Sequence, residues 1–180
     1  MPHAVILVDE LDQEVGQREK LAAHREGALH RAVSVFAFDA AGDLIMQRRA
    51  PGKYHSGGLW SNSACTHPRA GESVDAAARR CMREELGVPC ASLVEMFSFI
   101  YRAQVSPSLV EHEFDHVLVA TVHGALSPDP DEVEDVRHVS LPDAWREVSE
   151  SPERFTAWFP LALTRLRALG GQLPAPETAR

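Results

Sequence analysis

Two pairs of side chains in this sequence have types and spacings that can move protons or bind a metal ion. Cys65 and His67 lie two residues apart, and so do Glu111 and Glu113. In extended backbone, residues i and i+2 emerge on the same face, so each pair can present both side chains to one site. Two further histidines stand in a polar upstream segment, at His24 and His30. Taken singly, each of these features also fits a solvated surface.

The segment that follows residue 68 predicts an amphipathic helix with an acidic end. Glu72 or Ser73 can cap a helix over residues 75–86, and Gly87 ends it. Acidic groups one helical turn apart point the same way and could hold Mg²⁺ against a phosphorylated substrate. The positions concerned are 81, 84 and 85, of which Glu84 and Glu85 are acidic.

Composition limits the partners that this chain can have. Its 180 residues are 44% hydrophobic and 24% charged, which is typical of one ordinary globular domain. The net charge of −8 argues against nucleic acid or an anionic membrane as a partner, so an anionic substrate needs a local basic cluster. Three cysteines suit free thiols in a reducing cytoplasm, and the N-terminus does not resemble a signal peptide.

Hydrophobic patterning predicts an α+β fold, a mixed sheet sandwiched between helices. We expect an edge strand at residues 4–8 and a hairpin of 33–38 with 44–47. Residues 10–31 show no clear periodicity. The remaining expected strands are 93–101, 116–122 and 133–140, and the remaining helices are 141–149 and 155–169. We expect one domain over residues 1–170 and a disordered tail over 171–180.

The acidic helix resembles the Nudix box. The matching positions are Glu72, Arg80, Met82, Glu84, Glu85, Gly87 and Val88. Two positions depart from the pattern: Thr66 replaces a glycine, and Cys81 replaces the glutamate after the arginine. Cys81 removes an oxygen ligand that a hydrolase would use. The remaining carboxylates suit a magnesium ion already carried by a diphosphate better than the activation of a water.

The whole set of residues resembles one Nudix-fold family, the type I isopentenyl-diphosphate isomerases, over residues 4–160. The run from Trp60 to Pro68, Trp-Ser-Asn-Ser-Ala-Cys-Thr-His-Pro, is its most specific element. The other matching elements are Lys20, His24, His30, Arg48-Arg49-Ala50, Lys53, Gly58-Leu59, Gly71-Glu72-Ser73, Glu85-Leu86-Gly87, Tyr101-Arg102-Ala103, Glu111, Glu113 and Phe155-Thr-Ala-Trp158. This resemblance implies an enzyme that interconverts isopentenyl and dimethylallyl diphosphate by a 1,3 proton shift.

The resemblance also implies roles for individual residues. Cys65 and Glu113 would transfer the protons, with Tyr101 beside Glu113 and Trp158 facing the developing cation. The implied diphosphate contacts are Lys20, Arg49, Lys53 and, from the helix, Arg80 or its neighbour Arg83. The implied metal ligands are His24, His30, His67, Glu111 and Glu113. Such a mixed set suits Mn²⁺ or Zn²⁺, while Glu85 would hold the Mg²⁺ that accompanies the diphosphate.

Several alternatives remain open at this point. The helix can be a solvated one with ordinary charge pairing, and the periodicity of residues 155–169 alone favours Trp158 as a core residue. The chain could instead be a Nudix hydrolase of a nucleotide or prenyl diphosphate, or a silent binding module. We expect a small prenyl diphosphate as partner, neither nucleic acid nor membrane, and a monomer or weak homodimer.

Overall fold

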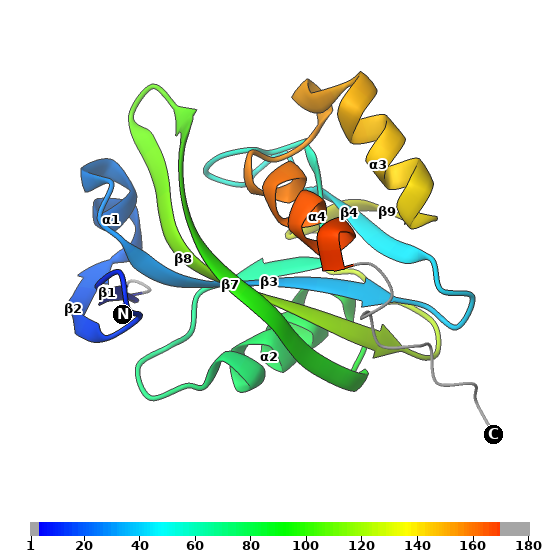
Figure 1. Ribbon diagram of the computed structural model, residues 1–180, viewed down its shortest axis with the longest axis horizontal. Helices are drawn as coiled ribbons and strands as arrows, with labels where there is room; N and C mark the ends of the chain where they lie inside the picture. Colours follow the sequence, from blue (N-terminus) through cyan, green and yellow to red (C-terminus); the bar gives the residue numbers. More distant parts are fainter. Residues whose placement is uncertain (1–3, 170–180) are drawn as a thin grey trace.

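Residues 4–169 are described by the structure, a computed structural model, and they confirm the α+β fold (Figure 1). At the centre of one mixed sheet, β3 (His30–Phe38) runs parallel to β8 (Leu109–Val122). Antiparallel strands extend the sheet from both of them. These are β4 (Leu44–Arg49), β5 (Trp60–Ser61), β6 (Ala64–Thr66), β7 (Cys90–Ser106) and β9 (Val133–Val139).

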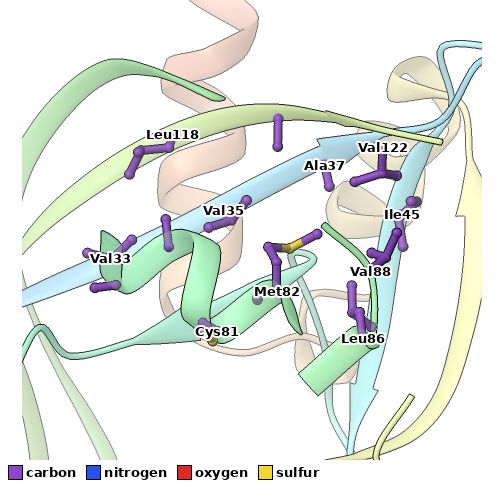
Figure 2. Close-up of a cluster of buried hydrophobic side chains, with 14 of the residues drawn as sticks. Val33, Val35, Ala37, Ile45, Cys81, Met82, Leu86, Val88, Leu118 and Val122 are labelled. Carbon is purple, nitrogen blue, oxygen red and sulfur yellow. The ribbon is translucent and has the colours of Figure 1, made fainter. Parts of the chain in front are cut away.

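Helices cover both faces of this sheet because β3 alternates apolar residues between them. Val33 and Val35 pack against α2 (Val74–Leu86), where Met82 and Leu86 are fully buried (Figure 2). Phe36 points to the opposite face and joins the core under two later helices. These are α3 (Leu141–Glu150) and α4 (Trp158–Leu169), on the other side of the sheet from α2 (Figure 1).

The N-terminal region differs from the expectation. The strand β1 (Ala4–Val8) does not lie at the edge, because β2 (Glu14–Glu19) pairs with its outer side. A short helix, α1 (Lys20–Glu26), follows, and the Glu19 carboxylate accepts hydrogen bonds from its first backbone N–H groups. Neither β2 nor α1 was predicted, because six and seven mostly polar residues show no hydrophobic period; capping and tertiary contacts form them instead.

The hairpin of β7 and β8 is longer than predicted. Strand pairing includes residues 102–106 and 109–115, on either side of a tight turn, whereas the sequence had suggested a break between two shorter strands. Glu111 and Glu113 therefore lie within β8 and not in a loop. At the other end of the chain, α4 begins at Trp158, three residues later than predicted, after the short 3₁₀ turn η1 (Pro152–Arg154). Phe155 forms a parallel bridge to Trp60 and cannot be helical.

The other predicted elements are observed close to their expected bounds. β3 and β4 form the predicted hairpin, but β3 begins at residue 30 instead of 33 and β4 ends at residue 49 instead of 47. α2 begins at Val74, and β9 and α3 each differ by one residue at one end. Within residues 4–169, no helix is both long and apolar enough to span a bilayer. The predicted tail, 171–180, lies outside the described residues, and the domain bounds 1–170 stay a prediction.

Candidate active site

A cavity of about 430 Å³ opens between the sheet, α1, α2 and the start of α4. Its wall contains Cys65, Tyr101, Glu113 and Trp158, which lie far apart in the sequence. The predicted cations Lys20, Arg49, Lys53 and Arg80 line the same cavity, as do the predicted ligands His67, Glu85 and Glu111. His24 and His30 lie behind this wall and are fully buried.

β8 supplies the acidic floor of the site. Glu111, Glu113 and Asp115 alternate along the strand and so emerge on one face. The neighbouring strand places Tyr101 directly opposite Glu113, and its hydroxyl donates to Oε2 of Glu113 at 2.6 Å and to Oε2 of Glu111 at 3.2 Å. Burial and the two carboxylates raise the pKa of Tyr101 well above its usual value, so this phenol keeps its proton.

Two histidines from α1 and β3 turn the same ring nitrogen toward these carboxylates. Nδ1 of His24 lies 2.7 Å from the carbonyl oxygen of Lys20, and Nδ1 of His30 lies 2.8 Å from that of Ala28. A carbonyl only accepts hydrogen bonds, so each Nδ1 carries a proton, and Nε2 is the nitrogen that has the lone pair when the ring is neutral. Nε2 of His24 lies 3.5 Å from Oε1 of Glu111, and Nε2 of His30 lies 3.5 Å from Oε1 of Glu113.

A third histidine completes a cluster with the chemistry of a metal site. Nε2 of His67 lies 2.9 Å from Oε1 of Glu113, and one ligand atom from each of His24, His30, His67 and Glu113 lies within 4.8 Å of every other. Burial and the charge of Lys20 lower the pKa of His67 well below its usual value, so its imidazole is neutral, as a ligand must be.

One buried nitrogen atom indicates whether a metal ion fits among these residues. Nε2 of His30 is buried and has no hydrogen-bond partner among the residues that the structure describes. A buried polar atom without a partner is costly, and a metal ion would satisfy it. The imidazole and carboxylate donors therefore fit a divalent ion.

The thiol of Cys65 is held between neighbours on three elements. It lies 3.2 Å from Oδ1 of Asn62, to which it donates, and accepts a hydrogen bond of 3.2 Å from Nε1 of Trp158. The hydroxyl of Ser34 stands 3.7 Å away and itself donates to Oδ2 of Asp115. Burial, with the charge of Asp115, raises the pKa of Cys65 to about 12, so the sulfur carries its proton.

Sequence reasoning did not assign a role to Asn62, Ser34 or Asp115. Asn62 is fully buried and donates to the carbonyls of Val35 and Ala64, which directs its oxygen toward Cys65 and Trp158. Asn62 belonged to the most specific run of the sequence, but its contacts depend on strand pairing that a sequence does not display. Asp115 continues the alternation of Glu111 and Glu113, which was an available signal.

The predicted substrate-binding cations differ in their burial and in the contacts that they already make with other residues of the protein. Arg49 is 7% exposed, and its guanidinium lies over the Trp158 ring, 5.4 Å from the centroid. Lys53 pairs with Glu132 and lies 3.6 Å from Glu85. Burial lowers the pKa of Lys20, which stands over the ring of Tyr54.

Of these four cations, Arg80 forms the most hydrogen bonds with other residues of the protein. Its guanidinium forms two hydrogen bonds, 2.8 and 2.9 Å long, with the carboxylate of Glu72, and it also binds Glu84 and the carbonyl of His67. In this structure Arg80 therefore fastens α2 to the loop before it. Its contact with a substrate stays a prediction.

α2 presents one glutamate to the cavity in a fixed position. Glu85 is 8% exposed and accepts a hydrogen bond of 2.8 Å from Gln47, whereas the side chain of Glu84 is about half exposed. Cys81 stands where a Nudix hydrolase would have a third carboxylate. It is buried and donates to the carbonyl of Cys65 at 3.5 Å. The box helix therefore offers the cavity fewer oxygen ligands than a complete box would.

One histidine at the site was missed altogether. His55 lies in the loop of residues 50–59, and its Nε2 approaches Oε1 of Glu111 to 2.6 Å. No other candidate metal-ligand residue lies at an i, i+2 spacing from His55, so the sequence gave no signal for its role.

Comparisons with known proteins identify the family of this chain. The NUDIX domain family model matches residues 28–159. Two relatives in Aromatoleum aromaticum are named Isopentenyl-diphosphate Delta-isomerase 2 and 1. The first is 49% identical over 95% of this chain and 92% of its own, and the second 46% identical over 93% and 94%. A relative in Burkholderia multivorans, named Isopentenyl-diphosphate Delta-isomerase, is 44% identical over 92% and 93%.

Solved structures share the fold at lower identity. DR0079 from Deinococcus radiodurans superposes with a TM-score of 0.74 at 24% identity, covering 91% of this chain and 98% of its own. A MutT protein from Methanosarcina mazei gives a TM-score of 0.64 at 16% identity, covering 80% and 96%. The fold, the matched domain and the relatives together show that this chain belongs to the NUDIX domain family and, within it, to the isopentenyl-diphosphate Delta-isomerases.

Proposed function

We propose that this enzyme interconverts isopentenyl diphosphate and dimethylallyl diphosphate by moving one proton onto the alkene and removing another two carbons away. One observation carries the proposal. A thiol, Cys65, and a carboxylate with its phenol, Glu113 and Tyr101, face one cavity whose rim is rich in cations. Hydrolysis of a diphosphate needs no such pair, whereas a proton shift needs two groups that exchange protons with carbon.

The cations would hold the diphosphate end of the substrate. Lys20, Arg49 and Lys53 line the cavity in a protein of net charge −8, so they form a local positive region for an anion. The substrate would arrive with Mg²⁺ on its phosphates. Glu85, aimed into the cavity by Gln47, is the carboxylate best placed to contact that ion.

Cys65 and Glu113 would perform the proton transfers. An alkene is a weak base, so its protonation requires an acid in a pocket from which water is excluded. Because the reaction runs in both directions, each group gives a proton in one direction and accepts one in the other. Tyr101, 2.6 Å from Glu113, would hold or relay the proton on the carboxylate side, while Asn62 and Trp158 hold the sulfur.

The His/Glu cluster would hold a divalent ion, which we propose to be Mn²⁺ or Zn²⁺. His24, His30, His67, Glu111 and Glu113 would be its ligands. When bound, such an ion withdraws charge from its carboxylate ligands and so adjusts their acidity. The protein's own contribution is to orient the imidazoles of His24 and His30 through the carbonyls of Lys20 and Ala28, so that Nε2 of each ring faces the carboxylates.

Trp158 would face the positive charge that develops on the substrate. The ring of Trp158 already accommodates a cation, because the Arg49 guanidinium lies over it. An aromatic face of this kind stabilises a desolvated cation by about 2 kcal/mol. Its indole N–H simultaneously binds the Cys65 sulfur, which ties this surface to the proton-transfer group.

Product analysis tests the proposal against hydrolysis. The purified enzyme, given isopentenyl diphosphate with Mg²⁺ and Mn²⁺, should form dimethylallyl diphosphate and release no phosphate. Formation of isopentenyl monophosphate and phosphate without the isomer would favour the hydrolase. We further infer a reducing compartment such as the cytoplasm from the three unpaired cysteines, and a monomer or weak homodimer.

A further inference from the structure

The loop of residues 50–59, here called the 50–59 loop, brings a fourth histidine to the His/Glu cluster. His55 is 6% exposed, and its Nε2 lies 2.6 Å from Oε1 of Glu111. One ligand atom from each of His24, His55 and Glu111 lies within 4.8 Å of the other two. We propose that His55 is an additional protein ligand of the ion held by His24, on the Glu111 side of the cluster. The proposal rests on the proposed function of this cluster as a metal site.

The chemistry of His24 requires one ion and not two. Nδ1 of His24 faces the carbonyl of Lys20, so only Nε2 offers a lone pair, and one lone pair binds one ion. The set of His24, His55 and Glu111 therefore cannot hold an ion of its own beside the set that contains His30 and His67. Because both sets share His24, one ion at this position would draw its ligands from four imidazoles and two carboxylates.

The contact of His55 with Glu111 brings together two atoms that bind divalent ions. Nε2 of His55 and Oε1 of Glu111 lie 2.6 Å apart. Imidazole nitrogens and carboxylate oxygens are both ligands of such ions. Nδ1 of His55 lies 3.1 Å from the Ser56 hydroxyl, which can accept a hydrogen bond from it and so leave Nε2 as the ligand atom.

The 50–59 loop adopts a strained backbone that aims His55 inward. Ser56 has a φ of +53°, a conformation that residues with a side chain rarely adopt. A Cβ on Gly57 would stand 2.7 Å from the carbonyl oxygen of Pro51, so only glycine fits there. Arg49 fastens the loop by donating to the carbonyl of His55 at 3.4 Å. Strain of this kind occurs mainly where it positions a functional group.

The competing role for His55 is that of an outer partner, which orients Glu111 by a hydrogen bond and never touches the ion. Two substitutions separate these roles. His55→Ala removes both the ligand and the hydrogen bond, whereas His55→Gln keeps an N–H donor for Glu111 but replaces the imidazole. The matched control is His123→Ala, since His123 is exposed and follows the far end of β8.

Zinc affinity, measured by competition with a chromophoric chelator and without substrate, gives the first readout. We expect His55→Ala and His55→Gln both to weaken binding by at least about tenfold, while His123→Ala leaves it unchanged. Restoration of wild-type affinity by His55→Gln would overturn the proposal in favour of the outer role. Unchanged affinity in His55→Ala would overturn it as well.

Nitrogen NMR of the wild-type protein, with ¹⁵N in its histidines, keeps the test independent of how the variants fold. On addition of Zn²⁺, the Nε2 resonance of His55 should move to the position of a metal-bound imidazole, together with that of His24. A His55 Nε2 resonance that stays at the position of a hydrogen-bonded ring would contradict the proposal. Both readouts measure binding alone, so they remain separate from whether the enzyme isomerises isopentenyl diphosphate.

Discussion

At Cys65, the surroundings favour a sulfur that keeps its proton until a substrate arrives. The thiol donates to Asn62 and accepts from Trp158, and the nearest hydroxyl, Ser34, directs its own proton to Asp115. No cation lies among these hydrogen-bonding neighbours within residues 4–169, unlike in a nucleophilic cysteine, which is activated by a neighbouring positive charge. These contacts fit proton transfer better than covalent attack.

Replacement of the thiol tests its role directly. Cys65→Ser keeps the approximate size of the side chain, but a serine hydroxyl is a far weaker acid than a thiol, so proton transfer should fail. We expect turnover of isopentenyl diphosphate to fall by about 10³-fold or more, measured as dimethylallyl diphosphate formed. Cys90→Ser, on the outer strand β7, is the control and should keep most activity. Comparable loss in both variants would point to damage of the fold instead.

The raised pKa of Cys65 predicts the pH dependence of its chemical modification. With a pKa of about 12, the metal-free protein at pH 8 holds about a thousandfold less thiolate at Cys65 than an ordinary cysteine does. Alkylation by iodoacetamide, followed by peptide mass spectrometry, should therefore be slow and should rise about tenfold per pH unit through pH 10. A rate that levels off below pH 9 would contradict this pKa.

Among the elements, those that hold a strong pattern were predictable and those built by tertiary contacts were not. α2 shows an apolar face and ends at Gly87, so its bounds follow from the sequence. α1 has only seven residues and forms because Glu19 caps it and His24 packs inward. The i, i+2 spacing identified Glu111 and Glu113. His55 depends on the path of the 50–59 loop, which has no period to detect.

The C-terminal end of α2, close to Glu85, is a point at which a substitution should lower the stability of the protein. Gly87 has a φ of +66°, and a Cβ there would stand 2.4 Å from the carbonyl oxygen of Ser127. The segment beyond Ser127 binds the helix end, since the N–H of Asp129 donates to the carbonyl of Glu85. We expect Gly87→Ala to lower the free energy of unfolding by about 2–4 kcal/mol in urea titrations, the combined cost of the left-handed backbone and the clash.

The control for this prediction is Gly42→Ala. Gly42 also has a positive φ, +84°, but a Cβ there would meet nothing within 4 Å. Its substitution should cost only the backbone term, about 1 kcal/mol. Equal losses in the two variants would show that the contact with Ser127 contributes nothing.

For the whole molecule, the His/Glu cluster links segments that are distant in sequence. α1 contributes His24, β3 contributes His30, the 50–59 loop contributes His55, and β8 contributes both glutamates, while His67 directly follows β6. An ion bound between them would therefore stabilise the arrangement of the N-terminal region on the sheet. Binding to the native state alone raises stability by RT ln(1 + [L]/Kd).

Metal removal should consequently lower the melting temperature. With Zn²⁺ or Mn²⁺ at about 100 times its Kd, the gain of about 2.7 kcal/mol corresponds to a rise of about 5–10 °C in a chain of this size. Calorimetry with and without chelator measures the shift. His67→Ala should abolish it and the exposed His123→Ala should retain it; a shift that persists in His67→Ala would place the ion elsewhere.

The central claim is that protons move to and from carbon in this cavity while the diphosphate stays intact. Incubation of the enzyme and its metals with isopentenyl diphosphate in D₂O, followed by NMR and mass spectrometry of the recovered diphosphates, tests it most directly. We predict dimethylallyl diphosphate with deuterium in its methyl group, and further exchange into both isomers at equilibrium. Unlabelled isopentenyl diphosphate together with released phosphate would contradict the claim.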